Sequence, residues 1–260
     1  MTTSEKIKKS IKDTLLDPDG PVLDDDFLAL CGERNRRFVE RLRAEEDAER
    51  AAEAARQHRK EHPRIGVLAI QGDYAAHAAA LTEAGADPVE VRNPGELDTL
   101  DGLILPGGES TTMLKFLERP NPAGSSFFDR LRDFAATKPV FGTCAGCILL
   151  ARTVTHPPQK SLCLLDATVE RNAYGRQIDS SILTAPSSLP GDPLEMVFIR
   201  APRIAQTGPA VEVLARRDES PVLVRQGNLM AATFHPELSS DRRVHRLFVE
   251  TVRGQYGSKE

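Results

Sequence analysis

Short apolar runs alternate with helix-like segments from Arg64 onward, and this alternation restricts the fold more than any other feature of the chain. The first run, residues 65–70, is continuously apolar, as in a strand buried on both faces. Further strands are expected at residues 88–92, 102–105 and 139–142, and helices at residues 74–84, 110–117 and 127–136. Strands joined through helices by short connections predict a parallel sheet with helices on both faces.

The section between residues 164 and 229 is richer in short runs that favour strands. These runs are residues 167–170, 177–183, 196–199, 211–215 and 221–225. A last core-type strand is expected at residues 230–234, and a helix follows over residues 241–253.

The fraction of charged residues falls sharply near Pro63. Of the first 64 residues 29 are charged, against 43 of the other 196. Residues 1–27 carry little apolar content and are expected to be loosely ordered, whereas a charged helix is expected from Asp26, a candidate N-cap, to about His62. That helix is either a solvated arm or a surface that binds a partner or itself. We therefore expect an N-terminal extension at residues 1–63, an α/β domain at 64–254 and a tail at 255–260.

Composition excludes several classes of protein. The net charge of −4 argues weakly against a nucleic-acid or anionic-membrane partner. No apolar run is long enough for a transmembrane helix, and the N-terminus lacks the apolar region of a secretory signal. Four cysteines are too few for a disulfide scaffold, so a reducing cytoplasm is the expected compartment.

Cys144 is the centre of Gly142-Thr143-Cys144-Ala145-Gly146, between a predicted strand and a helical run at residues 147–152. This pattern is typical of a nucleophile elbow with cysteine in place of serine, in which the flanking glycines leave room for a sharp strand-to-helix turn. A helix N-terminus also favours a thiolate. The pattern predicts a nucleophile rather than a buried structural cysteine.

His235-Pro236-Glu237 directly follows the last core-type strand. A catalytic thiol needs a general base, and a histidine base needs a carboxylate that orients it. Alone the tripeptide is a weak signal, because a capping turn would explain it about as well. Together with the elbow it predicts a catalytic site, since both motifs follow strands at the edge where open α/β sheets bind ligands.

The loop Leu105-Pro106-Gly107-Gly108-Glu109-Ser110-Thr111 follows another predicted strand. Its glycines let backbone amides approach a ligand closely, and these amides are candidate oxyanion donors for a tetrahedral intermediate at Cys144. Ser110 is expected to cap the next helix, and a phosphate-binding loop is disfavoured because no Gly-Lys-Ser/Thr follows. Spacing alone indicates ordinary surface residues at Gln71, Arg171, Asn172, Ile199 and Arg200.

The other cysteines and histidines predict neither a metal site nor a cofactor. Cys144 and Cys147 form a C-x-x-C pair without a second pair, so zinc is not expected. Redox use of the pair stays open, although Cys147 lies one helical turn on, where a core residue belongs. Cys31 and Cys163 have no partner pattern, and the other histidines show no metal spacing: His58, His62, His77, His156 and His245.

The ordered motifs resemble those of the class I glutamine amidotransferases, whose triad is Cys, His and Glu. They are most similar to the glutaminase subunits of pyridoxal 5′-phosphate synthases. The elbow and His-Pro-Glu belong to the wider superfamily, and the stretches 170–177 and 198–202 narrow the resemblance, which covers about residues 64–254. It implies a three-layer fold with a central, mostly parallel sheet, preceded here by the charged extension.

The resemblance implies hydrolysis of L-glutamine to L-glutamate and ammonia through a γ-glutamyl thioester on Cys144. His235 would be the general base and acid, and Glu237 would orient it. Glutamine would contact Gly108, Glu109, Ser110, Arg171, Ile199 and Arg200. Gly108 and Ala145 would supply oxyanion amides, and Gln71 would gate that hole. Ammonia would pass to the lyase subunit of a pyridoxal 5′-phosphate synthase, within a large hetero-oligomer.

Three features depart from this family. The extension at residues 1–63 is additional, position 147 is cysteine where a larger apolar residue is usual, and residues 155–165 differ from the glycine-containing loop of the family. None of them touches the triad. Three alternatives stay open: an amidotransferase serving another synthase, a thiol sensor on the same fold, and a scaffold whose main feature is the N-terminal arm.

Overall fold

The computed structural model describes residues 33–121, 124–171 and 180–257. They fall into two units, one ending at Gln57 and one beginning at His58. Helix α3 (Glu33–Glu61) forms the described part of the first unit and ends in the second. It confirms the described part of the expected charged helix, and its described side chains are nearly all exposed. The expected cap at Asp26 and the residue Cys31 lie outside the described residues.

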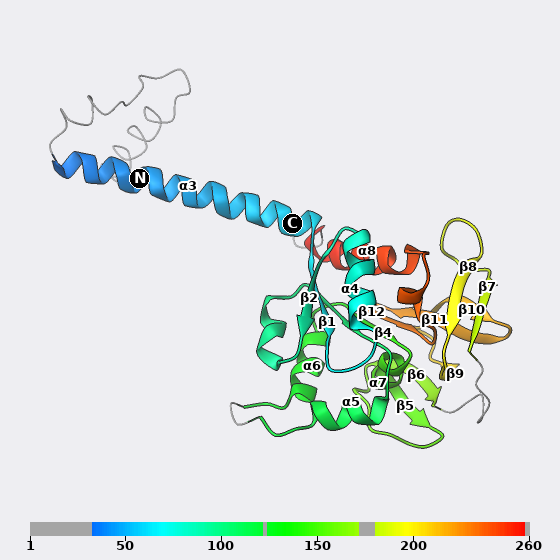
Figure 1. Cartoon of the computed structure of the whole chain (residues 1–260). Coiled ribbons are helices and arrows are strands. Elements are labelled where there is room, and N and C mark those ends of the chain that lie inside the picture. The colour runs from blue at the N-terminus through cyan, green and yellow to red at the C-terminus, as the bar shows by residue number, and fades with distance from the viewer. Residues whose placement is uncertain (1–32, 122–123, 172–179, 258–260) are drawn as a thin grey trace. The chain divides into compact units, whose positions relative to one another are not determined.

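The second unit is built on a seven-stranded sheet in the order β10-β11-β12-β4-β3-β1-β2 (Figure 1). Its strands are β1 (Arg64–Leu68), β2 (Asp87–Val91), β3 (Gly102–Leu105), β4 (Val140–Thr143), β10 (Glu212–Arg217), β11 (Ser220–Gln226) and β12 (Leu229–Ala232). The five strands from β12 to β2 run parallel, and β11 and β10 are antiparallel. The expected mostly parallel sheet is confirmed.

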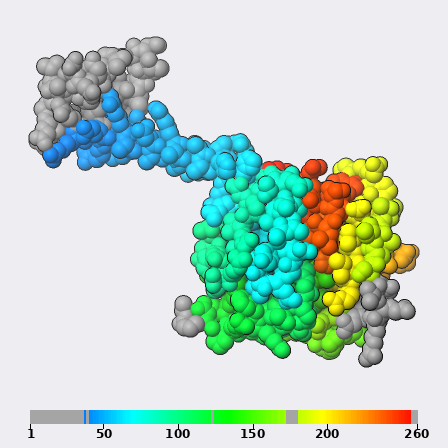
Figure 2. Space-filling view, viewed as in Figure 1, coloured from blue at the N-terminus to red at the C-terminus, as the bar shows by residue number. Residues whose placement is uncertain are grey.

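Helices cover both faces of this sheet. They are α4 (Tyr74–Glu83), α5 (Ser110–Leu117), α6 (Phe127–Ala135), α7 (Ala145–Leu150) and α8 (Arg243–Gly257). Successive residues of β3 point to opposite faces. Leu103 therefore packs in one apolar cluster with side chains of α5, α6 and α7, and Ile104 packs in the other with side chains of α4 and α8. Figure 2 shows α4 in cyan beside α8 in red, and these two helices cover that second face.

The second half of the unit adds strands outside the main sheet. A three-stranded sheet joins β5 (Ala151–Thr155), β6 (Leu165–Glu170) and β9 (Arg203–Thr207), and a hairpin joins β7 (Ser181–Ala185) to β8 (Leu194–Phe198). The expected helical run at residues 147–152 was wrong at its end, because the backbone becomes extended at Ala151 and β5 begins there. The strand β9 was not expected, and the last core strand ends at Ala232 rather than at residue 234.

The last turn of α3, from His58 on, belongs to the second unit and is tied to the sheet of that unit. Arg59 donates two hydrogen bonds of 2.9 Å to the nearly buried carboxylate of Asp101, which also accepts the backbone N–H of Arg64. At the other end of the chain, α8 continues to Gly257, beyond the expected helix end and into the expected tail. Among the described helices, none is long and apolar enough to cross a bilayer.

Candidate active site

Cys144 occupies a strained turn between β4 and α7. It is the N-cap of α7, with φ 48° and ψ −102°, a conformation that a non-glycine residue rarely adopts. A Cβ on Gly142 would lie 2.5 Å from the backbone of Gly146, and one on Gly146 would lie 2.0 Å from the Leu105 oxygen. Both flanking glycines are therefore required by close packing, which confirms the predicted elbow.

His235 follows β12 by three residues and lies beside Cys144. Its Nδ1 is 2.8 Å from Oε1 of Glu237, which belongs to the short 3-10 helix η2 (Pro236–Leu238). Burial lowers the pKa of His235, but the Cys144 sulfur and the Glu237 carboxylate outweigh it and raise that pKa to about 10. The imidazole is thus held as a cation between two acceptors.

The two motifs open into one cleft of about 500 Å³ at the carboxyl ends of the parallel strands. The cleft is lined by Gln71, Gly72, Asp73, Gly107, Gly108, Glu109, Ser110, Cys144, Ile148, Arg171, Ile199, Arg200, Pro202 and His235. Gly107 packs so closely on the His235 ring that a Cβ there would lie 2.4 Å from Cε1. The loop after β3 thus forms one wall directly over the base.

All six residues expected to contact a substrate line this cleft: Gly108, Glu109, Ser110, Arg171, Ile199 and Arg200. Gln71 also lines it. Ile199 and Arg200 are exposed, as spacing alone indicates, whereas Gln71 and Arg171 are half-buried. Asn172 lies outside the described residues. Ala145 is fully buried as the first residue of α7. Glu237 is buried behind His235.

Glu109, not Ser110, caps helix α5. Its carboxylate accepts the backbone N–H groups of Thr111 and Thr112 at 3.0 and 2.7 Å, and Nη2 of Arg171 lies 3.5 Å away. Burial raises the pKa of Glu109, but the hydrogen bonds from both threonines outweigh it and lower that pKa to about 2. The expected Ser110 cap was wrong because the longer carboxylate of the preceding residue reaches both amides.

Ser110 instead contacts the loop of residues 155–165, which differs from the glycine-containing loop expected for the family. Its hydroxyl donates to Oε1 of Gln159 at 2.8 Å. In the same cleft, the side chain of Gln71 lies against Gly108, and its Oε1 is buried without a hydrogen-bond partner among the described residues. Such an unsatisfied oxygen is costly, so Gln71 is poised to accept a new donor.

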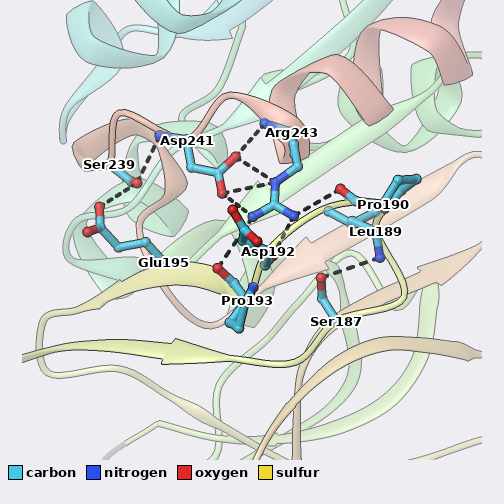
Figure 3. A network of polar contacts seen from close by, with 9 residues as sticks. All are labelled: Ser187, Leu189, Pro190, Asp192, Pro193, Glu195, Ser239, Asp241 and Arg243. Atoms are coloured by element: carbon cyan, nitrogen blue, oxygen red, sulfur yellow. Dashed lines mark hydrogen bonds and ion pairs between the residues drawn. The ribbon is translucent and has the colours of Figure 1, made fainter.

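A polar network fixes the chain that follows Glu237 (Figure 3). Ser239 donates to the Glu195 carboxylate at 2.6 Å and accepts the backbone N–H of Asp241. Arg243 pairs with Asp241 and donates to the carbonyl oxygens of Pro190 and Asp192 at 3.0 and 2.7 Å. The segment carrying His235 and Glu237 is therefore anchored just beyond Glu237.

Two histidines that sequence reasoning left as scattered lie behind the site. His77 in α4 and His245 in α8 are fully buried, with His77 Nδ1 3.1 Å from His245 Nε2. His77 Nε2 lies 3.1 Å from Oγ1 of Thr143. A signal was present, because His77 shares a helix face with the apolar residues Ala80 and Leu81, and a histidine on a buried face requires polar partners.

The other two thiols that the structure describes, Cys147 and Cys163, do not line the cleft. Cys147 is fully buried, and burial raises the pKa of its thiol, as expected for the core position predicted one turn after Cys144. Cys163 is exposed and free. Within the ranges that the structure describes, no three His, Cys, Asp or Glu side chains come together as a metal site.

Known proteins share both the motifs and the fold. A family model described as the SNO glutamine amidotransferase family matches residues 67–254. The chain belongs to this family. A pyridoxal 5′-phosphate synthase subunit PdxT from Koribacter versatilis is 58% identical over 197 residues, covering 75% of this chain and 100% of that protein. The PdxT of Solibacter usitatus is 53% identical over 196 residues, covering 73% of this chain and 99% of that protein.

A solved structure supports the same conclusion about the fold of this SNO glutamine amidotransferase. The crystal structure of a glutamine amidotransferase is 44% identical, with a TM-score of 0.65, and covers 72% of this chain and 98% of that chain. The resemblance inferred from the motifs, and the three-layer fold that it implies, are confirmed.

Proposed function

We propose that this chain is the glutaminase subunit of a pyridoxal 5′-phosphate synthase. It hydrolyses L-glutamine to L-glutamate and ammonia for vitamin B6 biosynthesis. The observation that carries this proposal is the strained Cys144 in one cleft with the His235–Glu237 pair, in a chain that matches PdxT proteins over nearly their whole length. Cys144, His235 and Glu237 are the proposed triad.

The first half of the reaction forms a thioester. With His235 protonated, the Cys144 sulfur attacks the side-chain amide carbon of glutamine as a thiolate and forms a C–S bond. The C–N bond then breaks, and His235 gives its proton to the leaving nitrogen, which departs as ammonia. In the second half, water attacks the γ-glutamyl thioester, His235 accepts the proton of that water, and the C–S bond breaks to release glutamate.

The oxyanion of each tetrahedral intermediate needs backbone N–H donors. The N–H of Cys144 is already bonded to the Ala232 oxygen at 2.9 Å, so it is unavailable. The N–H of Ala145 is in the first turn of α7, where amides have no partner within the helix, and Gly108 lines the same cleft as Cys144. We assign these two amides to the oxyanion, and the unsatisfied Gln71 to the gate over Gly108.

The cleft wall is suited to the α-amino acid end of glutamine. Arg171 supplies a cation for the substrate carboxylate, and Glu109 supplies an acceptor for the α-ammonium group. Ser110, Ile199 and Arg200 complete the binding wall. These assignments leave the reacting amide directed toward Cys144.

Ammonia is delivered to the lyase subunit of the synthase, which the PdxT names imply as the partner. We propose that the two subunits form a large hetero-oligomer. The thiol chemistry requires Cys144 to stay reduced, which fits a cytoplasmic location.

The test is glutamate release from L-glutamine by the wild-type chain, alone and mixed with a pyridoxal 5′-phosphate synthase lyase subunit. Cys144→Ala is the matched variant, because it removes one sulfur at a buried site. We expect release that rises on mixing and is lost by at least about a thousandfold in Cys144→Ala. A folded wild-type chain that releases no glutamate in the mixture would contradict the proposal.

A further inference from the structure

A second polar group reaches the proposed triad from the side remote from the cleft. The His77 imidazole comes from α4 and is fully buried. Its Nε2 lies 3.2 Å from Oε2 of Glu237 and 3.1 Å from Oγ1 of Thr143, the residue before the nucleophile. One nitrogen therefore faces both the orienting carboxylate and the strand that carries Cys144.

Glu237 needs such a neighbour. Its Oε1 faces His235 Nδ1 at 2.8 Å, while its Oε2 is buried without a hydrogen-bond partner in the described part of the chain. The carboxylate side chain is fully excluded from solvent. Burying half of a carboxylate without a donor is costly, and the approaching His77 Nε2 is placed to supply one with a small rotation.

The proton on His77 is best placed on Nε2. Burial first, and then His245 and His235, hold the pKa of His77 well below its ordinary value, so the ring is neutral and has a single N–H. With that hydrogen on Nε2, the Nε2–H of His245 donates to His77 Nδ1, and the unpartnered His245 Nδ1 is a bare nitrogen. The opposite tautomer would turn a lone pair toward the Glu237 carboxylate and bury an N–H on His245 without an acceptor.

We propose that His77 is a positioning residue whose Nε2–H holds Oε2 of Glu237, so that Oε1 stays on His235 Nδ1. This inference rests on the proposed function, because it matters only if Glu237 orients a working base. His77 is not among the residues that line the cleft, and it acts through Glu237 rather than on the substrate.

Two amide substitutions at His77 form a matched pair. In His77→Gln the side-chain amide reaches the former position of Nε2, toward Glu237, whereas in His77→Asn it reaches only the position of Nδ1, toward His245. Outer partners of metal-bound histidines are typically worth about 10- to 100-fold in activity, and we take the same scale for the partner of Glu237. We expect a loss of kcat on that scale in His77→Asn, with KM unchanged, and recovery of most of the rate in His77→Gln, measured with the lyase subunit present.

A double-mutant cycle separates positioning from packing. In a Glu237→Ala background, His77→Asn should cost no further activity, because the carboxylate it holds is gone. The packing control is Leu81→Ala, on the same helix and in the apolar cluster of Ile65 and Phe248. It should lower Tm but should not reproduce the loss of kcat expected for His77→Asn. Equal losses in His77→Asn and His77→Gln, or an undiminished loss in the Glu237→Ala background, would overturn the inference.

The pKa of His235, followed by NMR, gives a readout that needs no activity. We expect it to fall in His77→Asn and to stay near the wild-type value in His77→Gln. If the wild-type chain releases no glutamate, the proposed function fails while this titration still decides the role of His77. A His235 pKa that is unchanged in a folded His77→Asn variant would overturn the inference by itself.

Discussion

His235 is held between a sulfur and a carboxylate, and its titration follows from those two neighbours. The pKa of about 10 in the folded chain lies above the ordinary value of 6.5. The charged imidazole therefore stabilises the fold fully below about pH 6.5, and this contribution is lost as the pH rises through about 10. The imidazolium that the proposed mechanism needs is thus present across neutral pH.

We predict that Glu237→Gln lowers the pKa of His235, because a neutral amide replaces the carboxylate that favours the imidazolium. The measurement is an NMR titration of the imidazole in wild type and variant. The loss of thermal stability between neutral pH and about pH 10 should also be smaller in the variant. An unchanged His235 pKa would show that Glu237 does not set the state of the base.

The residues of the proposed triad could be located from the sequence because each lies in a local motif. Gly142 to Gly146 and His235 to Glu237 define their own turns within five and three residues, and both turns follow buried strands. His77 could not be assigned, because its role depends on the packing of α4 against a carboxylate 160 positions later in the chain. Nothing in its immediate neighbours indicates that contact.

At the scale of elements, Glu109 both caps α5 and lines the cleft, so one side chain affects the stability of the helix and the shape of the site. Glu109 accepts two amides of the first helical turn, and removal of an N-cap side chain typically costs about 1 kcal/mol. We predict that Glu109→Ala loses about that much in the free energy of unfolding and also raises KM for glutamine. Chemical denaturation and steady-state kinetics measure the two effects.

Glu109→Asp is the control for this prediction. Aspartate is a good N-cap but holds its carboxylate closer to the backbone, so stability should stay within about 0.5 kcal/mol of wild type while KM still rises. A wild-type KM in both variants would remove Glu109 from the substrate site and leave it only as a cap.

The elements of the parallel sheet could be predicted because each buried strand is a continuous apolar run with a helix after it. β3 and α5 have the expected bounds. The strand β5 could not be predicted, because no glycine or proline separates it from α7. The helix α7 is only about one and a half turns long and passes directly into Ala151. β9 was missed because only Ile204 of its five residues is buried, so its alternation is weak.

At the scale of the whole chain, the role of residues 1–63, which precede the α/β domain, stays a prediction. The second unit begins at His58, and Arg59 holds the nearly buried Asp101. Whether residues 1–63 bind a partner, and whether 64–254 is the functional boundary, stay predictions. Composition alone could mark the boundary only approximately, because Arg59 belongs by its composition to the charged helix and by its contacts to the sheet.

Two truncations should behave differently. Deleting residues 1–57 retains Arg59, and we expect Tm and glutaminase activity close to those of the full chain. Deleting residues 1–63 also removes the hydrogen bonds to Asp101 and should cost about 1–3 kcal/mol of stability. Thermal denaturation with the activity assay checks both, and inactivity of the shorter deletion despite a native Tm would favour a direct role for the N-terminal arm.

The most direct test of the central claim follows the nitrogen itself. The complete synthase, formed by this chain and the lyase subunit, is given L-glutamine labelled with ¹⁵N in the amide, together with excess unlabelled ammonium. We predict ¹⁵N in the pyridoxal 5′-phosphate ring with wild type and only unlabelled product with Cys144→Ala. Ammonia released by wild type but absent from the product would contradict the claim that this chain supplies the synthase.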